Sequence, residues 1–297
     1  MPRHTRVAQA LPTIWRVPDP LGERIAPLLA ARDPPTRPGR PRSDARAARE
    51  AILSRRRRGV HWTQLPAAFP RDRSVHRTFQ RGIARGVGDR LWATLVSEGA
   101  ALGGGDGDEQ SPGLFVGRRP TGDKQSRGLF VGHGAVGGDA VGPNPPDRGK
   151  KGVKRSLRGE RTGGPGAGVG AGANGHDCQL LAQTIDASVV ERPAPTPERP
   201  QHVCLDKGDD NPTGHTAVAA HGSVPPIRRI GEEKRDEHGE TRSPARRWVG
   251  ERTLAWLSKC RALLVRSAKK ASNSLALLKL ACILIWFRRV HQLCLLG

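Results

Sequence analysis

A long glycine-rich middle, residues 101–175, limits where this chain can build a hydrophobic core. Its stretch GGPGAGVGAGAN has the length of a strand but almost no side chains to pack, and glycine weakens the interior of a strand. Two near-copies, GDEQSPGLFVG at 107–117 and GDKQSRGLFVG at 122–132, lie in the same region. A solenoid needs three or more repeats, so these two copies indicate a local duplication. The core is therefore expected mainly from the flanking segments.

The most convincing helical patterns lie in residues 244–296. In RRWVGERTLAWLSKCRALLVR, helical spacing places four residues on one apolar face: Leu254, Leu257, Cys260 and Leu264. The last segment, NSLALLKLACILIWFRRVHQL, is the most hydrophobic of the chain. Its apolar run of about 13 residues is shorter than the roughly 20 that span a bilayer, so we expect a buried core helix and no membrane partner.

The N-terminal 100 residues predict a set of short basic helices. RSDARAAREAILSRRRRG offers Ser43 as a helix N-cap and an apolar face with Ala51 and Ile52, and RSVHRTFQRGIARGVGDRLWATLV predicts two more helices. Such helices are typical of helix-turn-helix DNA-binding modules and, equally, of a plain helical bundle. The run Arg55 to Arg58 is either a solvated helix end that complements the helix dipole or a phosphate contact.

The charge of the chain points to polyanionic partners. It has 50 Lys and Arg against 28 Asp and Glu, a net charge of +22, and phosphate-contacting Lys and Arg release counterions when they bind nucleic acid. The basic residues are spread along the chain, which favours a broad DNA-facing surface over an appended arm. A ribosome-type binder or a merely soluble basic protein is the alternative.

The cysteines and the N-terminus favour a reducing, cytoplasmic location. The five cysteines show neither regular pairing nor CxxC spacing, which argues against a disulfide framework and a zinc site. MPRHTRVAQALPTIW lacks the continuous apolar stretch of a secretory signal.

A group of carboxylates interrupts the basic chain at CLDKGDDN. Residues 203–205 predict a short apolar strand that leads into Asp206, and the carboxyl end of such a strand faces the ligand crevice of an open α/β sheet. Carboxylate oxygens suit Mg²⁺ or Mn²⁺, two of which can promote phosphodiester cleavage. The same residues could simply form a solvated turn. Glu251, between Arg247 and Arg252, is either an ion-pair partner or a second metal ligand.

Several motifs together resemble the bacterial insertion-sequence transposases of the DDE class, in the IS-five-type group. They are GPNPPDRGKKGVKRS, GANGHDCQLL, CLDKGDDN and RRWVGERTLAWLSKCRALLVR, and GRPRSDARAAREAILSRRRRGVHWTQLPAAFP looks like the N-terminal domain of that group. The resemblance implies an α/β fold in three parts: a helical DNA-binding domain at 1–100, a glycine-rich linker at 101–140 and an RNase H-like core at 141–297.

The same resemblance implies a function and its partners. It implies a DNA transposase that cleaves and joins double-stranded DNA at transposon ends and target sites, with Mg²⁺ or Mn²⁺ as cofactor. It also implies assembly as a homodimer on DNA and a cytoplasmic, nucleoid-associated location in a bacterium.

Residues are assigned by position in the motifs. Asp206 matches the second aspartate of the catalytic triad and Glu251 its glutamate, and both would be metal ligands. Basic residues near the two motifs would hold DNA phosphates: Arg247, Arg252, Lys259, Arg148 and Lys150. A structural or supporting role is implied for Asn174, His176 and Asp177.

The chain also departs from the family pattern. The family's first aspartate precedes a glycine, whereas the corresponding steps here are Arg127-Gly128 and Pro112-Gly113. Asp123 and Asp108 each lie four residues before these steps, and Asp123 is the candidate for the first catalytic aspartate. The chain has no tyrosine; where the family has one, it has Asp209, Ser223, Ser243, Ser267 and Ser274, and Gly82 and Gly250 replace larger residues. A decayed or error-laden transposase sequence is therefore our hypothesis, with a non-catalytic DNA-binding remnant or an unrelated metal-dependent nuclease as alternatives.

Overall fold

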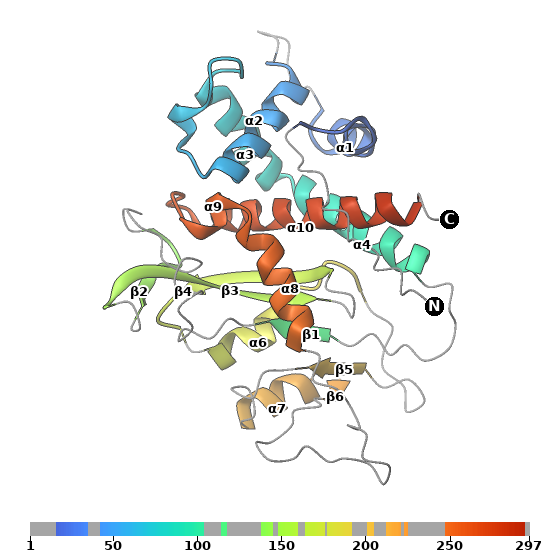
Figure 1. Cartoon of the computed structure of the whole chain (residues 1–297), viewed down its shortest axis with the longest axis vertical. Coiled ribbons are helices and arrows are strands. Elements are labelled where there is room, and N and C mark those ends of the chain that lie inside the picture. Colours follow the sequence, from blue (N-terminus) through green and yellow to red (C-terminus); the bar gives the residue numbers. More distant parts are fainter. Residues whose placement is uncertain are drawn as a thin grey trace, which may run out of the picture.

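The computed structural model shows a helical part stacked on a mixed sheet (Figure 1). It describes residues 16–34, 42–103, 114–117, 138–144, 148–159, 164–175, 177–191, 201–204, 212–220, 223–224 and 247–294. The helices are α1 (Asp19–Arg32), α2 (Ala45–Arg58), η1 (Trp62–Gln64), α3 (Asp72–Ala84), α4 (Val87–Gly103), α6 (Asp177–Asp186), α7 (Pro212–Ala219), α8 (Arg247–Ser258), α9 (Arg261–Leu264) and α10 (Ala271–Cys294). The strands are β1 (Leu114–Gly117), β2 (Gly142–Asn144), β3 (Lys150–Gly159), β4 (Pro165–Gly172), β5 (Gln201–Cys204) and β6 (Ser223–Val224).

Helix α2 forms where the sequence predicts it but begins one residue later than Ser43 suggests. The Asp44 carboxylate accepts hydrogen bonds from the backbone N–H groups of Arg46 and Ala47, both at 3.0 Å, so Asp44 is the N-cap. The helix ends at Gly59, whose φ of +69° is a left-handed conformation that glycine adopts without strain.

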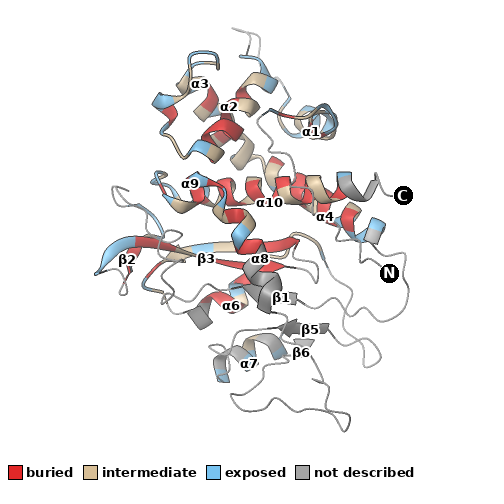
Figure 2. Ribbon diagram, viewed as in Figure 1, coloured by how far each residue is buried: buried red, intermediate tan, exposed pale blue. Residues whose placement is uncertain are grey.

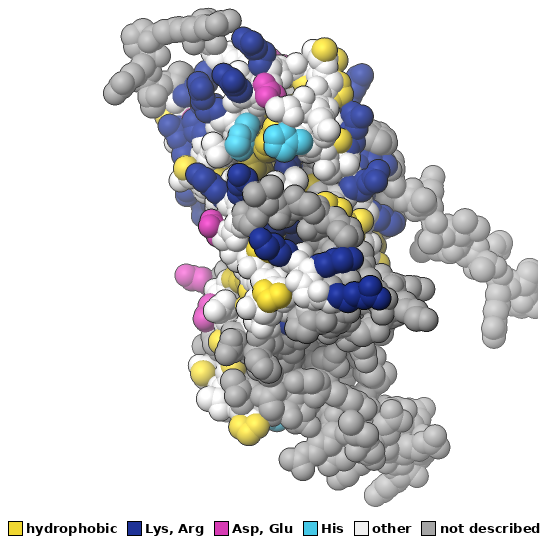
Figure 3. Space-filling view, turned by 90° about the vertical axis from the view of Figure 1, so that its left-hand side faces the viewer, with side chains coloured by type: hydrophobic (Ala, Val, Ile, Leu, Met, Phe, Trp, Pro, Cys, Tyr) yellow, Lys and Arg dark blue, Asp and Glu magenta, His cyan; other side chains and the backbone are white. Residues whose placement is uncertain are grey.

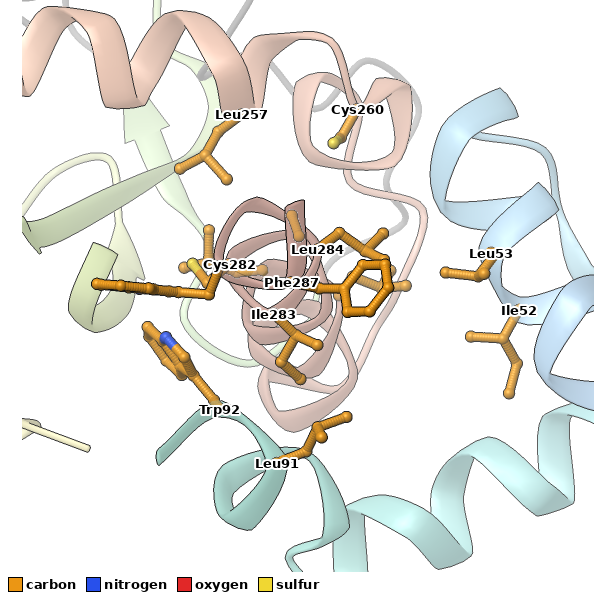
Figure 4. Packing of buried hydrophobic residues seen from close by; sticks show 14 of the residues in the cluster. Ile52, Leu53, Leu91, Trp92, Leu257, Cys260, Cys282, Ile283, Leu284 and Phe287 are labelled. Carbon is orange, nitrogen blue, oxygen red and sulfur yellow. The ribbon is translucent and has the colours of Figure 1, made fainter. Parts of the chain in front are cut away.

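Helix α10 is the centre of the hydrophobic core. Figure 4 looks along it and shows side chains from α2, α4 and the α8–α9 region around it, among them Ile52, Trp92 and Leu257. It packs against α3, α4, α8, α9 and β4, and its buried residues lie on more than one side of the helix. Figure 2 shows the buried residues concentrated between the helical part and the sheet. The predicted core helix is therefore confirmed.

By length and composition, residues 271–291 could cross a membrane, which corrects the shorter sequence estimate. Inside the structure, 56% of the most apolar window is buried against other elements of the same chain.

The apolar face predicted to run at helical spacing through Leu254, Leu257, Cys260 and Leu264 is interrupted, because the helix breaks at Cys260. The backbone of Cys260 is extended (φ −99°, ψ 96°), and α9 starts at the next residue. The turn lets Leu263 enter the core, whereas Leu264 is only partly buried.

The sheet has the strand order β2-β3-β1-β5-β6, with β4 also paired to β3. β3 is antiparallel to β1, β2 and β4, whereas β5 is parallel to β1 and β6 is parallel to β5. Helix α6 packs on β3 and β4, and α8 packs on β1 and β3. The mixture of helices and strands agrees with the predicted α/β class.

The strands β1 to β4 all come from the glycine-rich middle, residues 101–175. β1 is the LFVG of the upstream repeat copy, and β4 is the glycine-rich stretch itself. At Gly168 a Cβ atom would lie 3.0 Å from the Leu157 side chain and 3.3 Å from Leu278 of α10. The missing side chain at this position lets α10 approach the sheet closely.

Candidate active site and DNA-binding surface

The elements that carry the two predicted catalytic carboxylates both border β1. β5 lies parallel to β1, with Leu114 opposite Val203 and Phe115 opposite Cys204. Asp206 follows β5 by two residues but lies outside the described residues. Glu251 lies within α8, which packs on β1, although its side chain is outside what the structure describes. The roles of Asp206 and Glu251 therefore stay predictions.

The region of the first catalytic aspartate is only partly described. β1 begins directly after Pro112-Gly113, so the upstream repeat copy supplies the strand next to β5. β1 consists of Leu114, Phe115, Val116 and Gly117, none of which is a carboxylate. Asp123 lies outside the described residues.

No group of three or more His, Cys, Asp or Glu side chains that could hold a metal ion occurs within the described ranges. Asp206, Asp209 and Asp210 fall outside those ranges, so the predicted metal ligands are not placed.

The predicted DNA-binding residues lie in different parts of the sheet region. Arg148 and Lys150 are exposed at the turn between β2 and β3, where Arg148 has a positive φ of 52°. Lys259 is exposed at the end of α8 near α9, and Arg247 and Arg252 lie on α8 with side chains outside the described set. Of the supporting residues, Asn174 is exposed in the turn after β4, His176 lies outside the described residues, and Asp177 begins α6.

The arginine run at the end of α2 is not a simple solvated end. Arg55 and Arg56 are buried, and only Arg58 is fully exposed. The Arg55 guanidinium lies 4.3 Å from the centre of the Trp62 ring, and Arg56 Nη1 lies 2.8 Å from the Sγ atom of Cys260. The prediction of a solvated helix end is therefore wrong for Arg55 and Arg56. Burial lowers the pKa of Arg55 to about 10 and also lowers the pKa of Arg56.

Other arginines of the helical part are held by acidic partners. Asp33, after α1, accepts from Arg81 Nε at 2.9 Å, from Arg85 Nη1 at 2.5 Å and from Arg42 Nη1 at 3.1 Å. Arg46 Nη2 is paired with Asp19 at 2.6 Å. These pairs tie α1, α2 and α3 together and are not available for a ligand.

A second group of arginines remains available at the start of α3. Arg71, Arg73 and Arg77 are exposed, and none of them has an ion-pair partner among the described residues. Figure 3 shows Lys and Arg side chains spread over the helical part of this face, with few Asp or Glu between them. The sequence signal, a basic helix after a tight turn, pointed to this module but did not separate the paired arginines from the unpaired ones.

Two comparisons relate this chain to known proteins. Residues 17–92, which include α1 to α3 and the start of α4, match the family model described as "Putative transposase of IS4/5 family". The chain is 36% identical over 154 residues to the "Putative transposase for insertion sequence element IS402" of Burkholderia cepacia, which covers 51% of this chain and 71% of that protein. No solved structure matches the chain. The chain belongs to the bacterial insertion-sequence transposases.

Proposed function

We propose that this chain is a DNA transposase that acts on the ends of its insertion sequence through an RNase H-like core. The strand order carries the proposal most directly. β1, β3 and β4 form an antiparallel unit, and β5 and β6 continue the sheet parallel to β1, which is compatible with the RNase H-like core that the family resemblance implies. In this arrangement the strand before Asp206 and the helix with Glu251 both border the central strand β1.

Asp206 and Glu251 would hold Mg²⁺ or Mn²⁺ in this proposal, because carboxylate oxygens are the ligands these ions prefer. A bound ion would lower the pKa of a water molecule and stabilise the oxygen that leaves in phosphodiester cleavage. Arg247, Arg252 and Lys259, on and next to α8, would position the DNA backbone.

One specific observation favours a second function: no carboxylate stands at the position of the family's first catalytic aspartate. The step that the family occupies with Asp-Gly is Pro112-Gly113 directly before β1, or Arg127-Gly128 in the downstream copy. Proline offers no metal-binding side chain, and an arginine would repel a cation. The protein would then bind insertion-sequence ends without cutting them.

The DNA-binding surface in either case would include Arg71, Arg73 and Arg77 of α3. These exposed arginines have no internal partner in the described structure, so their charge is available to phosphates. Arg148 and Lys150 would extend the contact along the sheet. Two copies would bind as a dimer on DNA, in the cytoplasm and at the nucleoid.

The three predicted segments, 1–100, 101–140 and 141–297, would serve DNA binding, linkage and catalysis. α10 packs against both α4 and β4, so the first and last segments share one hydrophobic core. We therefore expect them to fold cooperatively and not as independent domains.

A cleavage assay on duplex DNA that carries the insertion-sequence ends, with Mn²⁺, tests the two functions. A transposase cuts this DNA, and Asp206→Asn or Glu251→Gln reduces the rate roughly 100-fold or more, above the loss typical of residues that only support metal ligands. Binding without cleavage, unchanged by Asp206→Asn, supports the non-catalytic function. Cleavage without preference for the end sequence points instead to a general nuclease.

Introducing the missing carboxylate sharpens the test. Pro112→Asp and, separately, Arg127→Asp each offer a third ligand at one of the two candidate steps. If the loss of this group inactivated the protein, one of the two variants gains Mn²⁺-dependent cleavage of end DNA, while Pro112→Asn, which adds no charge, does not.

A further inference from the structure

A cluster of basic side chains surrounds Trp62, where α2, η1, α3 and the segment before α10 meet. Arg55 lies over the buried Trp62 ring, and the His76 ring stacks on the same indole with a centroid distance of 4.8 Å. His61 and Lys270 lie close enough to His76 to affect its charge. Figure 3 shows two histidine side chains side by side in the upper part of the view, near Lys and Arg side chains.

Arg55 is the feature that calls for an explanation. Its exposed fraction is 1%, and among the described residues the one hydrogen bond of its side chain runs from Nη2 to Ser267 Oγ at 3.0 Å. Its Nε and Nη1 atoms have no hydrogen-bond partner in the described structure, and none of the described ion pairs includes it. A buried guanidinium without a carboxylate is costly, since its desolvation is not offset by an opposite charge.

The surroundings of Arg55 add positive charge. Lys270 and His61 are exposed, and His76 has a buried Nε2 atom without a partner in the described structure. Burial lowers the pKa of His76, and the charges of Arg55, His61 and Lys270 lower it further, while Asp72 alone acts in the opposite direction. The basic groups near this position are therefore Arg55, His61, His76 and Lys270, and Asp72 is the one carboxylate that raises the His76 pKa.

Ser267 connects the buried arginine to the surface. Its side chain is exposed, and its Oγ accepts the Arg55 hydrogen bond, so its own O–H group remains available to donate outward. An anion above Ser267 would accept a hydrogen bond from this hydroxyl group, and Lys270, which is exposed, follows three residues later in the chain.

We propose that His61, His76, Ser267 and Lys270, supported from below by Arg55, bind one phosphate group of the DNA backbone. This inference rests on the DNA binding proposed above and adds a specific phosphate position to it. A phosphate provides a negative charge near Arg55, which has no carboxylate partner among the described ion pairs, and its several oxygens can accept hydrogen bonds from more than one donor.

The pair Ser267→Asp and Ser267→Asn tests the site, because the two variants differ only in charge. Ser267→Asp places a carboxylate against Arg55, so it raises the melting temperature but repels phosphate. The slope of log affinity against log salt for end-sequence duplex DNA, measured by fluorescence anisotropy, then falls by about 1 in magnitude, as for the loss of one phosphate contact. Ser267→Asn leaves the slope near the wild-type value.

Lys270→Gln and Lys279→Gln provide a second matched pair. Each removes one positive charge, but Lys279 is paired with Asp89 elsewhere on the molecule. Lys270→Gln reduces the slope by about 1 and Lys279→Gln leaves it unchanged. Equal slopes for Ser267→Asp, Lys270→Gln and Lys279→Gln overturn the inference.

Titration with inorganic phosphate, followed by the NMR signals of the His76 ring, separates this inference from the proposed function. Phosphate shifts these signals in the wild type but not in Ser267→Asp, and it raises the lowered His76 pKa, so that DNA binding tightens as the pH falls through the range in which His76 gains its proton. Phosphate shifts without DNA binding support the anion site and overturn the proposed function. DNA binding with no phosphate shift overturns the site and leaves the proposed function standing.

Discussion

Trp92 and Trp286 donate their indole N–H groups to the same acceptor, the backbone carbonyl of Pro165, at 2.9 and 2.7 Å. Trp92 belongs to α4, Trp286 to α10 and Pro165 to β4, so one buried oxygen joins the N-terminal helices, the C-terminal helix and the sheet. A carbonyl has two lone pairs and can accept both bonds.

Replacing both tryptophans by phenylalanine should cost more than the two single changes together. Trp92→Phe and Trp286→Phe each remove about 1 kcal/mol, because the other indole still satisfies the carbonyl. In the double variant the buried oxygen has lost both donors, which adds roughly 1–2 kcal/mol. Urea unfolding of the four proteins in a double-mutant cycle measures this term, and additivity within about 0.5 kcal/mol would show that the shared acceptor is unimportant.

Gly99→Ala should destabilise the protein, whereas Gly82→Ala should stabilise it. A Cβ atom at Gly99 of α4 would overlap the Trp286 ring, with its Cε3 atom at 2.8 Å, and such overpacking typically costs about 1–3 kcal/mol. At Gly82 of α3 a Cβ atom would meet nothing within 4 Å, so alanine gains about 0.5–1 kcal/mol of helix propensity. Thermal unfolding compares the two, and melting shifts of the same sign would contradict the packing described between α4 and α10.

The cap of α2 can be tested with two neighbouring residues. Asp44→Ala should cost about 1 kcal/mol, because the backbone N–H groups of Arg46 and Ala47 lose their acceptor. These hydrogen bonds lower the pKa of Asp44, so the cap stabilises the protein above the usual aspartate pKa of about 3.9 and the effect is lost as the pH falls below it. Ser43→Ala is the control and should have no effect in urea unfolding at pH 7. If Ser43→Ala lowered the free energy of unfolding more than Asp44→Ala does, Ser43 would be the N-cap of α2.

Cys282 should be unreactive in the folded protein. Its side chain is fully buried in α10, and burial, followed by the nearby Cys260, raises the pKa of its thiol far above 9.0. Iodoacetamide labelling read by peptide mass spectrometry should modify Cys282 only after urea unfolding, because the thiolate is the reactive form. Appreciable labelling of Cys282 in buffer alone would mean that α10 opens readily.

The same raised pKa has a consequence for stability. The unfolded thiol ionises near pH 9 and the folded one does not, so the stabilising contribution is complete below pH 9 and is lost as the pH rises above it. Cys282→Ala should therefore lose less stability between pH 8 and pH 10 than the wild type does, as measured by urea unfolding.

Local sequence patterns determined several parts of this protein. The apolar face of α2 and the strongly hydrophobic α10 can be predicted because helix formation and burial of one face depend on residues three and four positions apart. The motifs around Asp206 and Glu251 were sufficient to indicate the transposase family, which the relative from Burkholderia cepacia supports. A short motif can be recognised from the sequence alone, because its recognition does not depend on tertiary contacts.

Other features depended on contacts between distant segments. The break at Cys260, the burial of Arg55 against Trp62 and the recruitment of the glycine-rich β4 under α10 each result from a partner more than five residues away. The two repeat copies contain the same LFVG, so no local rule could select residues 114–117 as the strand between β3 and β5. Strand pairing and the burial of a charge are decided by which surfaces meet in the folded chain, because their free energies come from non-local packing and desolvation.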